Sequence, residues 1–116
     1  VEKQHAIRNL DQNALYWAGQ LRDIAEQAYV HGRTYSAEVW HEHFKRECLP
    51  EEFDADLTKE GYQKWDHTPS LERVLVGSTT QLTVKGFALY LQQVEAFGAC
   101  LGVMFHASPA DVRRMA

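Results

Sequence analysis

Apolar side chains recur every three or four positions in a stretch near the start of the chain. They are Ala14, Trp17, Ala18, Leu21, Ile24, Ala25 and Ala28. This spacing brings them to one face of an α-helix, and we predict a helix over residues 11–30 with that face buried. Asp11 is the expected N-cap, because its carboxylate can accept backbone N–H groups of the first turn. Gly32 is the expected stop after the last turn.

Two further helices have similarly clear boundaries. The second is predicted to begin near Ser36, a favourable N-cap, and to end at Leu49-Pro50, because the residue before a proline disfavours helical backbone. The third is predicted to begin at Thr83 and to end at Gly102. Its expected buried face consists of Val84, Phe87, Ala88, Leu91, Val94, Gly98 and Leu101.

The remaining segments predict a small sheet and a short last helix. Residues 71–77 alternate and then become continuously apolar, as in a strand. The expected partner is the stretch 1–7 or a strand outside this sequence, because a lone strand is unstable. The acidic stretch 51–57 can form a short helix before an irregular loop. Ser108-Pro109, with serine at the N-cap and proline at the first helical position, predicts a final helix.

These elements predict a single α+β domain over residues 1–116, mainly helical, with about three main helices, a short C-terminal helix and a small sheet. The composition, 45% apolar and 24% charged, is typical of a soluble globular protein. The sequence has no run of about 18 apolar residues, so we expect no membrane span. Its start lacks the apolar core of a signal peptide. Cys48 and Cys100 are expected to be reduced thiols of a cytoplasmic protein.

The sequence lacks the usual signatures of catalysis. It has no glycine-rich phosphate loop, no nucleophile elbow and no HExxH zinc motif. His41 and His43 are two residues apart, which places them on different faces of a helix. Asp54 and Asp56 resemble a carboxylate pair, but in an acidic loop such residues are usually solvated surface. We therefore expect no catalytic residue, metal or cofactor, and a metal-dependent nuclease is the least favoured alternative.

The net charge of −4 argues against a protein that grips nucleic acid over its whole surface. A nucleic-acid site would need a local cluster of positive charge. The basic candidates are Arg8 before the first helix, Lys85 at the start of the third, and Arg113 and Arg114 near the C-terminal end. The same residues are also compatible with dispersed, solvated charges.

Aromatic and amide side chains offer a second kind of candidate, because unpaired bases stack on rings. Trp17 and Trp40 lie on apolar helix faces, so core packing is expected for both. Trp65, in a polar loop, is expected to be the more exposed indole. Gln12 and Tyr16 lie near the start of the first helix, where they either contact phosphates and bases or only extend the cap.

Several segments, taken in order, resemble the NinB family of phage recombination proteins. They are Arg8 to Asn13, Leu15 to Ala18, His31 to Arg33, Ala37 to Trp40, Val76 to Thr80 and Val94 to Gly98. Two departures from the family are visible. Residues 50–70 look longer than the matching segment of the family's best-known member. Family members also have a strand-rich segment before the point where this sequence starts, so we expect a C-terminal fragment.

The resemblance implies a non-enzymatic recombination mediator. Such a protein binds single-stranded DNA and the host's single-strand binding protein, helps to load an annealing recombinase, and acts as a homodimer in the bacterial cytoplasm. Carried over by position, Gln12 and Trp17 are the leading DNA-facing residues, whereas Gln81 replaces a basic residue of the best-known member. The expected DNA site comprises Arg8, Gln12, Tyr16, Trp17, Lys85, Arg113 and Arg114. The main alternative is a protein–protein adaptor without intrinsic DNA binding.

Overall fold

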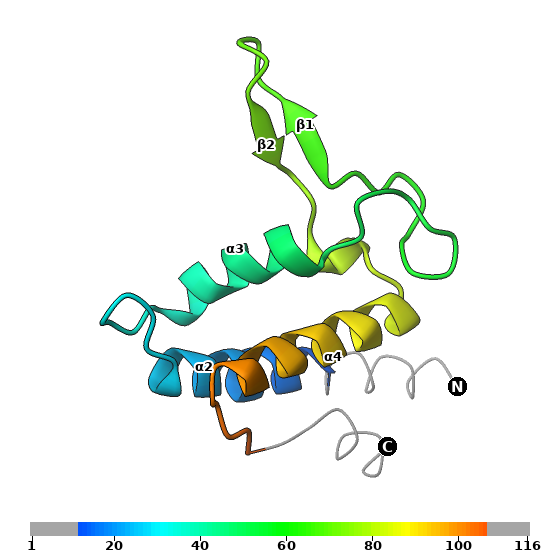
Figure 1. The fold of residues 1–116 in the computed structure, drawn as a ribbon. Helices are drawn as coiled ribbons and strands as arrows, with labels where there is room; N and C mark the ends of the chain where they lie inside the picture. Colours follow the sequence, from blue (N-terminus) through cyan, green and yellow to red (C-terminus); the bar gives the residue numbers. More distant parts are fainter. Residues whose placement is uncertain (1–11, 107–116) are drawn as a thin grey trace.

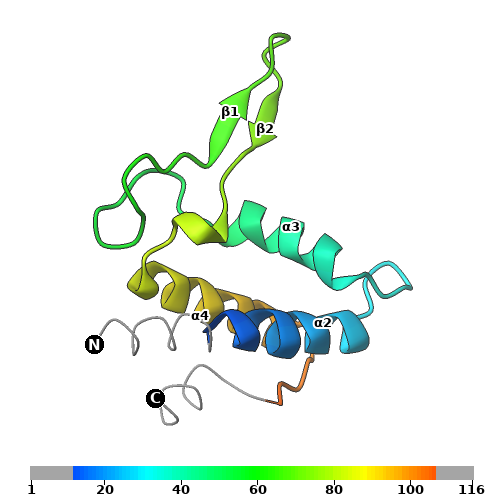
Figure 2. The same ribbon diagram turned by 180° about the vertical axis from the view of Figure 1, so that it is seen from behind.

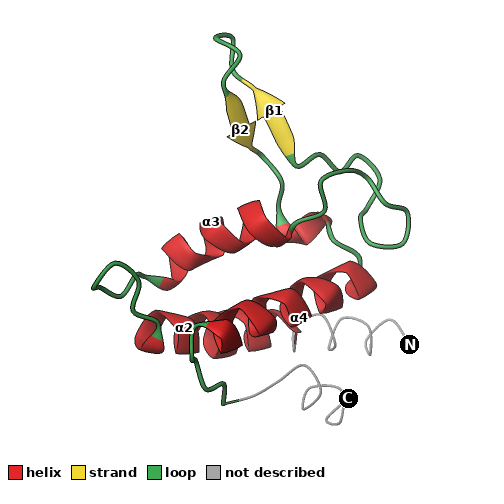
Figure 3. Ribbon diagram, viewed as in Figure 1, coloured by secondary structure: helices red, strands yellow, loops and turns green. Residues whose placement is uncertain are grey.

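A computed structural model describes residues 12–106 of the chain. Helical segments pack side by side, and a two-stranded hairpin projects away from them (Figures 1 and 2). Helices make up most of the secondary structure (Figure 3), so the fold is α+β and mainly helical, as predicted. The predictions for Arg8, for the cap at Asp11 and for the helix after Ser108 concern residues outside the described range.

The first helical segment has three parts. Residues 12–14 are α-helical, η1 (Leu15–Leu21) is a π-helix, and α2 (Arg22–Gln27) is α-helical again. The helix predicted over residues 11–30 therefore ends early, and its middle has a wider winding than predicted. A π-helix bonds residues five apart and is rare, so an apolar repeat of three and four does not distinguish it from an α-helix.

Gly32 shapes a turn and does not stop the first helix. The helix ends where Ala28 takes extended backbone, with φ −82° and ψ 122°. His31 and Gly32 then both have positive φ, 53° and 77°. They form the tip of a tight turn in which Val30 and Arg33 exchange backbone hydrogen bonds of 3.0 and 3.2 Å. Two successive positive φ values are typical of such a turn, and this accounts for the glycine.

The second helix, α3 (Ala37–Cys48), has the boundaries that were predicted. The Ser36 hydroxyl accepts a 3.3 Å hydrogen bond from the backbone N–H three residues on, which satisfies one free donor of the first turn. Leu49, before the proline, has extended backbone and ends the helix. The inner face carries Trp40 and Phe44, both buried.

The third helix, α4 (Val84–Cys100), also begins and ends as predicted. The Thr83 hydroxyl accepts a 3.0 Å hydrogen bond from the backbone N–H three residues on. Gly102, with φ 82°, donates to Ala99 at 3.0 Å and closes the last turn. Neither α4 nor any other helix within residues 12–106 has the length and apolarity that crossing a membrane requires.

The sheet is a hairpin formed by two neighbouring segments. β1 (Trp65–His67) pairs antiparallel with β2 (Arg73–Leu75). The strand predicted over 71–77 is therefore present but shorter, and its partner among the described residues comes from the predicted irregular loop. The alternative partner, residues 1–7, lies outside the described range. The stretch 51–57 contains turns and no helix. The strand signal in β1 was weak because its three residues are polar or aromatic and largely exposed.

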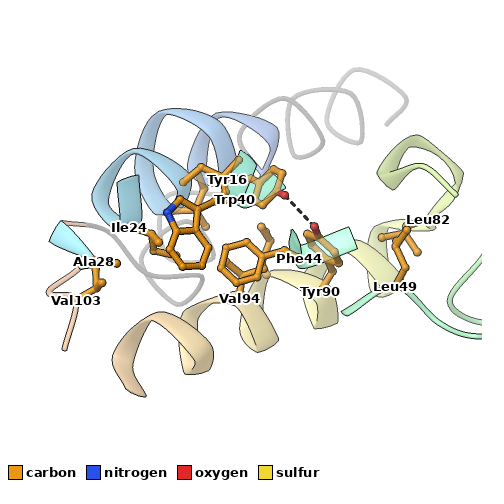
Figure 4. Packing of buried hydrophobic residues seen from close by; sticks show 13 residues of the cluster. Tyr16, Ile24, Ala28, Trp40, Phe44, Leu49, Leu82, Tyr90, Val94 and Val103 are labelled. Atoms are coloured by element: carbon orange, nitrogen blue, oxygen red, sulfur yellow. Dashed lines mark hydrogen bonds between the residues drawn. The ribbon is translucent and has the colours of Figure 1, made fainter. Parts of the chain in front are cut away.

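The core lies between the first helical segment, α3 and α4 (Figure 4). Tyr16 and Tyr90 are at its centre, 0% and 1% exposed. Trp40, 6% exposed, is a core residue as predicted, whereas Trp17 is 36% exposed and is not. The other buried members are Leu15, Leu21, Ile24, Ala28, Phe44, Leu49, Leu82, Leu91, Val94 and Val103. Within the predicted face of α4, Val84 and Leu101 are exposed instead.

The segment that follows α4 is fixed against the first helical segment. Gln27 accepts a 2.8 Å hydrogen bond from the Met104 backbone N–H and donates one of 2.9 Å to the Met104 carbonyl. Gly98 allows a close approach, because a Cβ there would lie 2.4 Å from the ring of Phe105. The chain after α4 therefore packs against α2 and α4 together.

Candidate nucleic-acid interface

Trp17 is a partly exposed indole that packs against two neighbouring rings. Its ring centroid lies 4.7 Å from that of His41 on α3 and 5.5 Å from that of Tyr16. Tyr16 is fully buried, so the indole is supported from beneath while 36% of the residue remains accessible. We call Trp17 together with His41 the Trp17 surface. An exposed ring held in one orientation can stack on an unpaired base at a low cost in side-chain entropy.

A chain of polar groups supports the Trp17 surface from inside the core. The Tyr16 hydroxyl lies 2.6 Å from His41 Nδ1 and 2.8 Å from the Tyr90 hydroxyl (Figure 4 shows the second contact). Burial lowers the pKa of His41, and nearby Lys45 lowers it further, so the neutral ring is favoured. In the neutral tautomer that leaves Nδ1 unprotonated, the Tyr16 O–H donates to Nδ1 and the Tyr90 O–H donates to Tyr16.

The same burial keeps both tyrosines in their neutral form. Removing the hydroxyls from water raises the pKa of Tyr16 and that of Tyr90 far above the usual value for tyrosine. Each hydroxyl therefore stays protonated at neutral pH. The result is a neutral, buried hydrogen-bonded chain that links η1, α3 and α4.

The described members of the predicted DNA site have different surroundings. Gln12 is half-buried and its Oε1 has no hydrogen-bond partner within residues 12–106. Lys85 is exposed in the first turn of α4, and Trp17 is partly exposed. Tyr16 is buried, so its ring cannot stack on a base, and its contribution is to hold Trp17 and His41. Arg8, Arg113 and Arg114 lie outside the described residues.

Trp17 and Lys85 lie at the same end of the packed helices. Phe87, two residues beyond Lys85 on α4, packs edge-on against Tyr16 with 5.9 Å between ring centroids. Tyr16 is the direct neighbour of Trp17 and also contacts its ring. The exposed indole and the first turn of α4, which carries the exposed lysine, thus both meet at one buried tyrosine, although 67 residues lie between Trp17 and Lys85 in the sequence.

The acidic residues that suggested a nuclease serve a turn in this structure. One carboxylate oxygen of Asp54 accepts hydrogen bonds from the backbone N–H groups of Asp56, at 2.8 Å, and Leu57, at 3.3 Å. Across residues 12–106, no group of three or more histidine, cysteine, aspartate or glutamate side chains is arranged to hold a metal ion. Both cysteines, Cys48 and Cys100, are free thiols, as predicted.

A separate apolar groove lies between α3 and the end of α4. Its volume is about 330 Å³. Trp40 lines it and is 6% exposed, and its buried indole N–H has no hydrogen-bond acceptor within the described residues. The residues around the groove are Val30, His31, Tyr35, Val39, Trp40, His43, Phe97 and Leu101. An open apolar surface with one unsatisfied donor suits a protein partner better than a polyanion.

Reasoning from the sequence missed the role of His41. The sequence predicts only that His41 and His43 lie on different faces of a helix, whereas His41 Nδ1 is 2.6 Å from the hydroxyl of a core tyrosine and the ring packs against Trp17. The available signal was its place in α3, one residue after buried Trp40 and three before buried Phe44, at the edge of the apolar face. A polar residue in that position is half-buried and needs a hydrogen-bond partner.

Comparisons with known proteins agree over most of the chain. A family model described as NinB protein matches residues 1–106. The NinB protein of Escherichia phage lambda and a prophage-derived NinB protein of Escherichia coli are each 33% identical over 104 residues, which is 89% of this chain and 63% of the relative. A solved NinB structure from structural genomics is similar with a TM-score of 0.59 at 29% identity, covering 91% of this chain and 69% of that one. The chain thus spans less than two thirds of the length of these curated relatives.

Proposed function

Because the chain belongs to the NinB family, we propose that it acts in phage recombination by binding single-stranded DNA at the Trp17 surface. The observation that carries the proposal is the partly exposed indole, held by His41 and a buried tyrosine. Bases stack on such rings with about 1–3 kcal/mol per base, with little sequence preference. Lys85, at the same end of the helices, supplies a positive charge for a phosphate.

The proposal assigns a role in DNA binding to three described residues. Trp17 stacks on a base, Lys85 attracts the backbone, and Gln12 offers its amide to a phosphate or base edge. Arg8, Arg113 and Arg114 are proposed as additional cationic contacts. A homodimer would place two such surfaces on one particle, and the bound strand would be passed to an annealing recombinase.

Anisotropy of a labelled thymidine oligonucleotide tests this proposal. Trp17→Ala should weaken binding by about 1–3 kcal/mol, the energy of one stacked base. Tyr29→Ala is a matched control, because it removes a ring that is 73% exposed and belongs neither to the Trp17 surface nor to the apolar groove. Equal affinity of the Trp17 variant and the unmodified chain would refute a site at Trp17. Gln12→Ala should also bind less tightly, and the thermal melts of each variant show whether it is folded.

A second candidate function, a protein–protein adaptor, is favoured by the apolar groove between α3 and α4. The proposed partner is the host's single-strand binding protein. Val39, which lines the groove and is 51% exposed, is a suitable probe. Val39→Glu should abolish capture of that purified protein, whereas Val84→Glu, at an exposed valine outside the groove, should not. Capture without any detectable DNA binding would favour the adaptor over the DNA-binding protein.

A further inference from the structure

Two arginines are held against one tryptophan at the base of the hairpin. The guanidinium carbon of Arg73 lies 3.9 Å from the centroid of the Trp65 ring, and that of Arg46, from α3, lies 5.5 Å from it. The ring itself is fixed, because its indole N–H donates to Glu51 at 2.9 Å. Both arginines are exposed.

The strand register separates the charges of the hairpin. Trp65 pairs with Leu75 and His67 pairs with Arg73. Residues that pair across an antiparallel ladder, and those two apart along a strand, share a face. Trp65, His67 and Arg73 are therefore on one face of the hairpin. Asp66, which pairs with a valine, is on the other.

The carboxylate that contacts Trp65, that of Glu51, is already paired with a lysine. Lys64, whose side chain is 0% exposed, places its ammonium 2.8 Å from a carboxylate oxygen of Glu51. The same ammonium donates to the carbonyls of Arg46, at 2.7 Å, and Leu49, at 3.0 Å. This buried lysine ties the hairpin to the end of α3 and balances the Glu51 charge. Within residues 12–106, neither Arg46 nor Arg73 has a carboxylate within 4.0 Å.

We propose that Arg46 and Arg73, positioned by Trp65, form a second binding site that takes the phosphates of a single DNA strand. A guanidinium stacked on an indole keeps its planar fork directed outward, and that fork matches two phosphate oxygens. The outer face of a stacked guanidinium can also carry an unpaired base, which a duplex does not offer. The choice of DNA as the ligand rests on the proposed function, whereas the site is separate from the Trp17 surface.

The hairpin tip adds an apolar contact beside these charges. Leu71 is 81% exposed and has a positive φ of 68°. An exposed leucine at the end of a protruding hairpin can pack against a splayed base while the two arginines hold the backbone. The site therefore extends from the end of α3 to the tip of the hairpin (Figure 1).

Salt-dependent titrations of the full chain with a thymidine oligonucleotide test this site. For single strands each neutralised phosphate contributes about 0.7 to the log–log salt slope, which corresponds to about fivefold in affinity at about 0.1 M salt. Arg73→Gln should therefore weaken binding about fivefold and reduce the slope by about 0.7. In Arg46→Gln/Arg73→Gln the loss of slope should double, and the affinity should fall by two successive fivefold factors. Arg73→Lys keeps the charge but loses the fork, so an intermediate loss is expected.

Arg33→Gln is the matched control. Arg33 lies 4.2 Å from the centroid of the Tyr35 ring, so the control removes a stacked arginine far from the hairpin and should leave the salt slope unchanged. If the unmodified chain binds but Arg73→Gln and the double variant, shown to be folded by circular dichroism, retain its affinity and slope, the hairpin site is refuted while the proposed function stands. If the unmodified chain binds no single strand, both proposals fall. A preference for duplex DNA, lost in the double variant, would also overturn the single-strand assignment.

Discussion

Replacing Tyr16 by phenylalanine should cost far more stability than its single oxygen suggests. The Tyr16 hydroxyl joins Tyr90 and His41 with contacts of 2.8 and 2.6 Å. In Tyr16→Phe the Tyr90 hydroxyl, on a residue 1% exposed, loses its partner. An unsatisfied buried hydroxyl costs about 1–3 kcal/mol and each lost hydrogen bond about 1 kcal/mol. His41 is half-buried and can be rehydrated, so we expect a total loss of about 2–4 kcal/mol.

Tyr90→Phe and the double variant separate the cost of the unsatisfied hydroxyl from the cost of the lost hydrogen bonds. In Tyr90→Phe the Tyr16 hydroxyl still has His41 as acceptor, so the loss should be only about 0.5–1.5 kcal/mol. The double variant removes both hydroxyls and leaves no buried orphan between them. It should therefore cost less than the sum of the two single changes, with a coupling of about 1–2 kcal/mol.

Urea denaturation followed by circular dichroism measures all three free energies of unfolding. Tyr62→Phe is the control, because the Tyr62 hydroxyl donates one hydrogen bond, to the Pro50 carbonyl, and its removal should cost about 1 kcal/mol. Additive effects of the two core substitutions, or a Tyr16→Phe loss no larger than the Tyr62→Phe loss, would refute the hydrogen-bonded chain as described.

Four further predictions concern single positions. Trp17→Ala should destabilise the protein by clearly less than the roughly 3–5 kcal/mol of a core tryptophan, since 36% of the residue is exposed; a urea titration showing a full core loss would contradict its placement. Because burial lowers the pKa of His41, the unfolded chain binds more protons just below pH 6.5, so the free energy of unfolding should fall as the pH drops below that value, and His41→Gln should flatten this dependence in urea titrations run from pH 7 to 5. Gly98→Ala should cost about 1–3 kcal/mol and expose backbone amides of residues 103–106 to hydrogen exchange, because its Cβ would overlap the ring of Phe105; unchanged exchange would show that the contact is absent. Leu71→Gly should raise the melting temperature slightly, because relief of a left-handed leucine, about 1–2 kcal/mol, exceeds the entropy cost of glycine, about 0.5–1 kcal/mol.

The helical part of the fold could be predicted because its boundaries depend on local chemistry. Ser36 and Thr83 are capping residues whose hydroxyls bond to nearby amides, and Gly102 supplies the positive φ that ends α4. These signals lie within a few residues of the feature that they determine. The hairpin depends instead on pairing between residues 65–67 and 73–75, and three-residue strands with exposed side chains carry little pattern.

The candidate sites could be predicted only in part, because they depend on tertiary contacts. Helical periodicity placed Trp17 in the core, and only the packing of His41 and Tyr16 against one side of it shows that the other side is open. The family resemblance names Trp17 as a DNA-facing residue, which stays a prediction. The arginines around Trp65 gave no sequence signal, since Arg46 and Arg73 are far apart along the chain and meet only at the Trp65 ring in the folded protein.

Binding of single-stranded DNA is tested most directly by the affinity of the unmodified chain for a labelled single strand and for its duplex at two salt concentrations. The chain should bind the single strand more tightly than the duplex. Its affinity should fall with salt, and the logarithm of the affinity should change with the logarithm of the salt concentration by about −0.7 for each phosphate contacted. Affinity that does not change with salt, or a clear preference for the duplex, would contradict the proposed binding of single-stranded DNA.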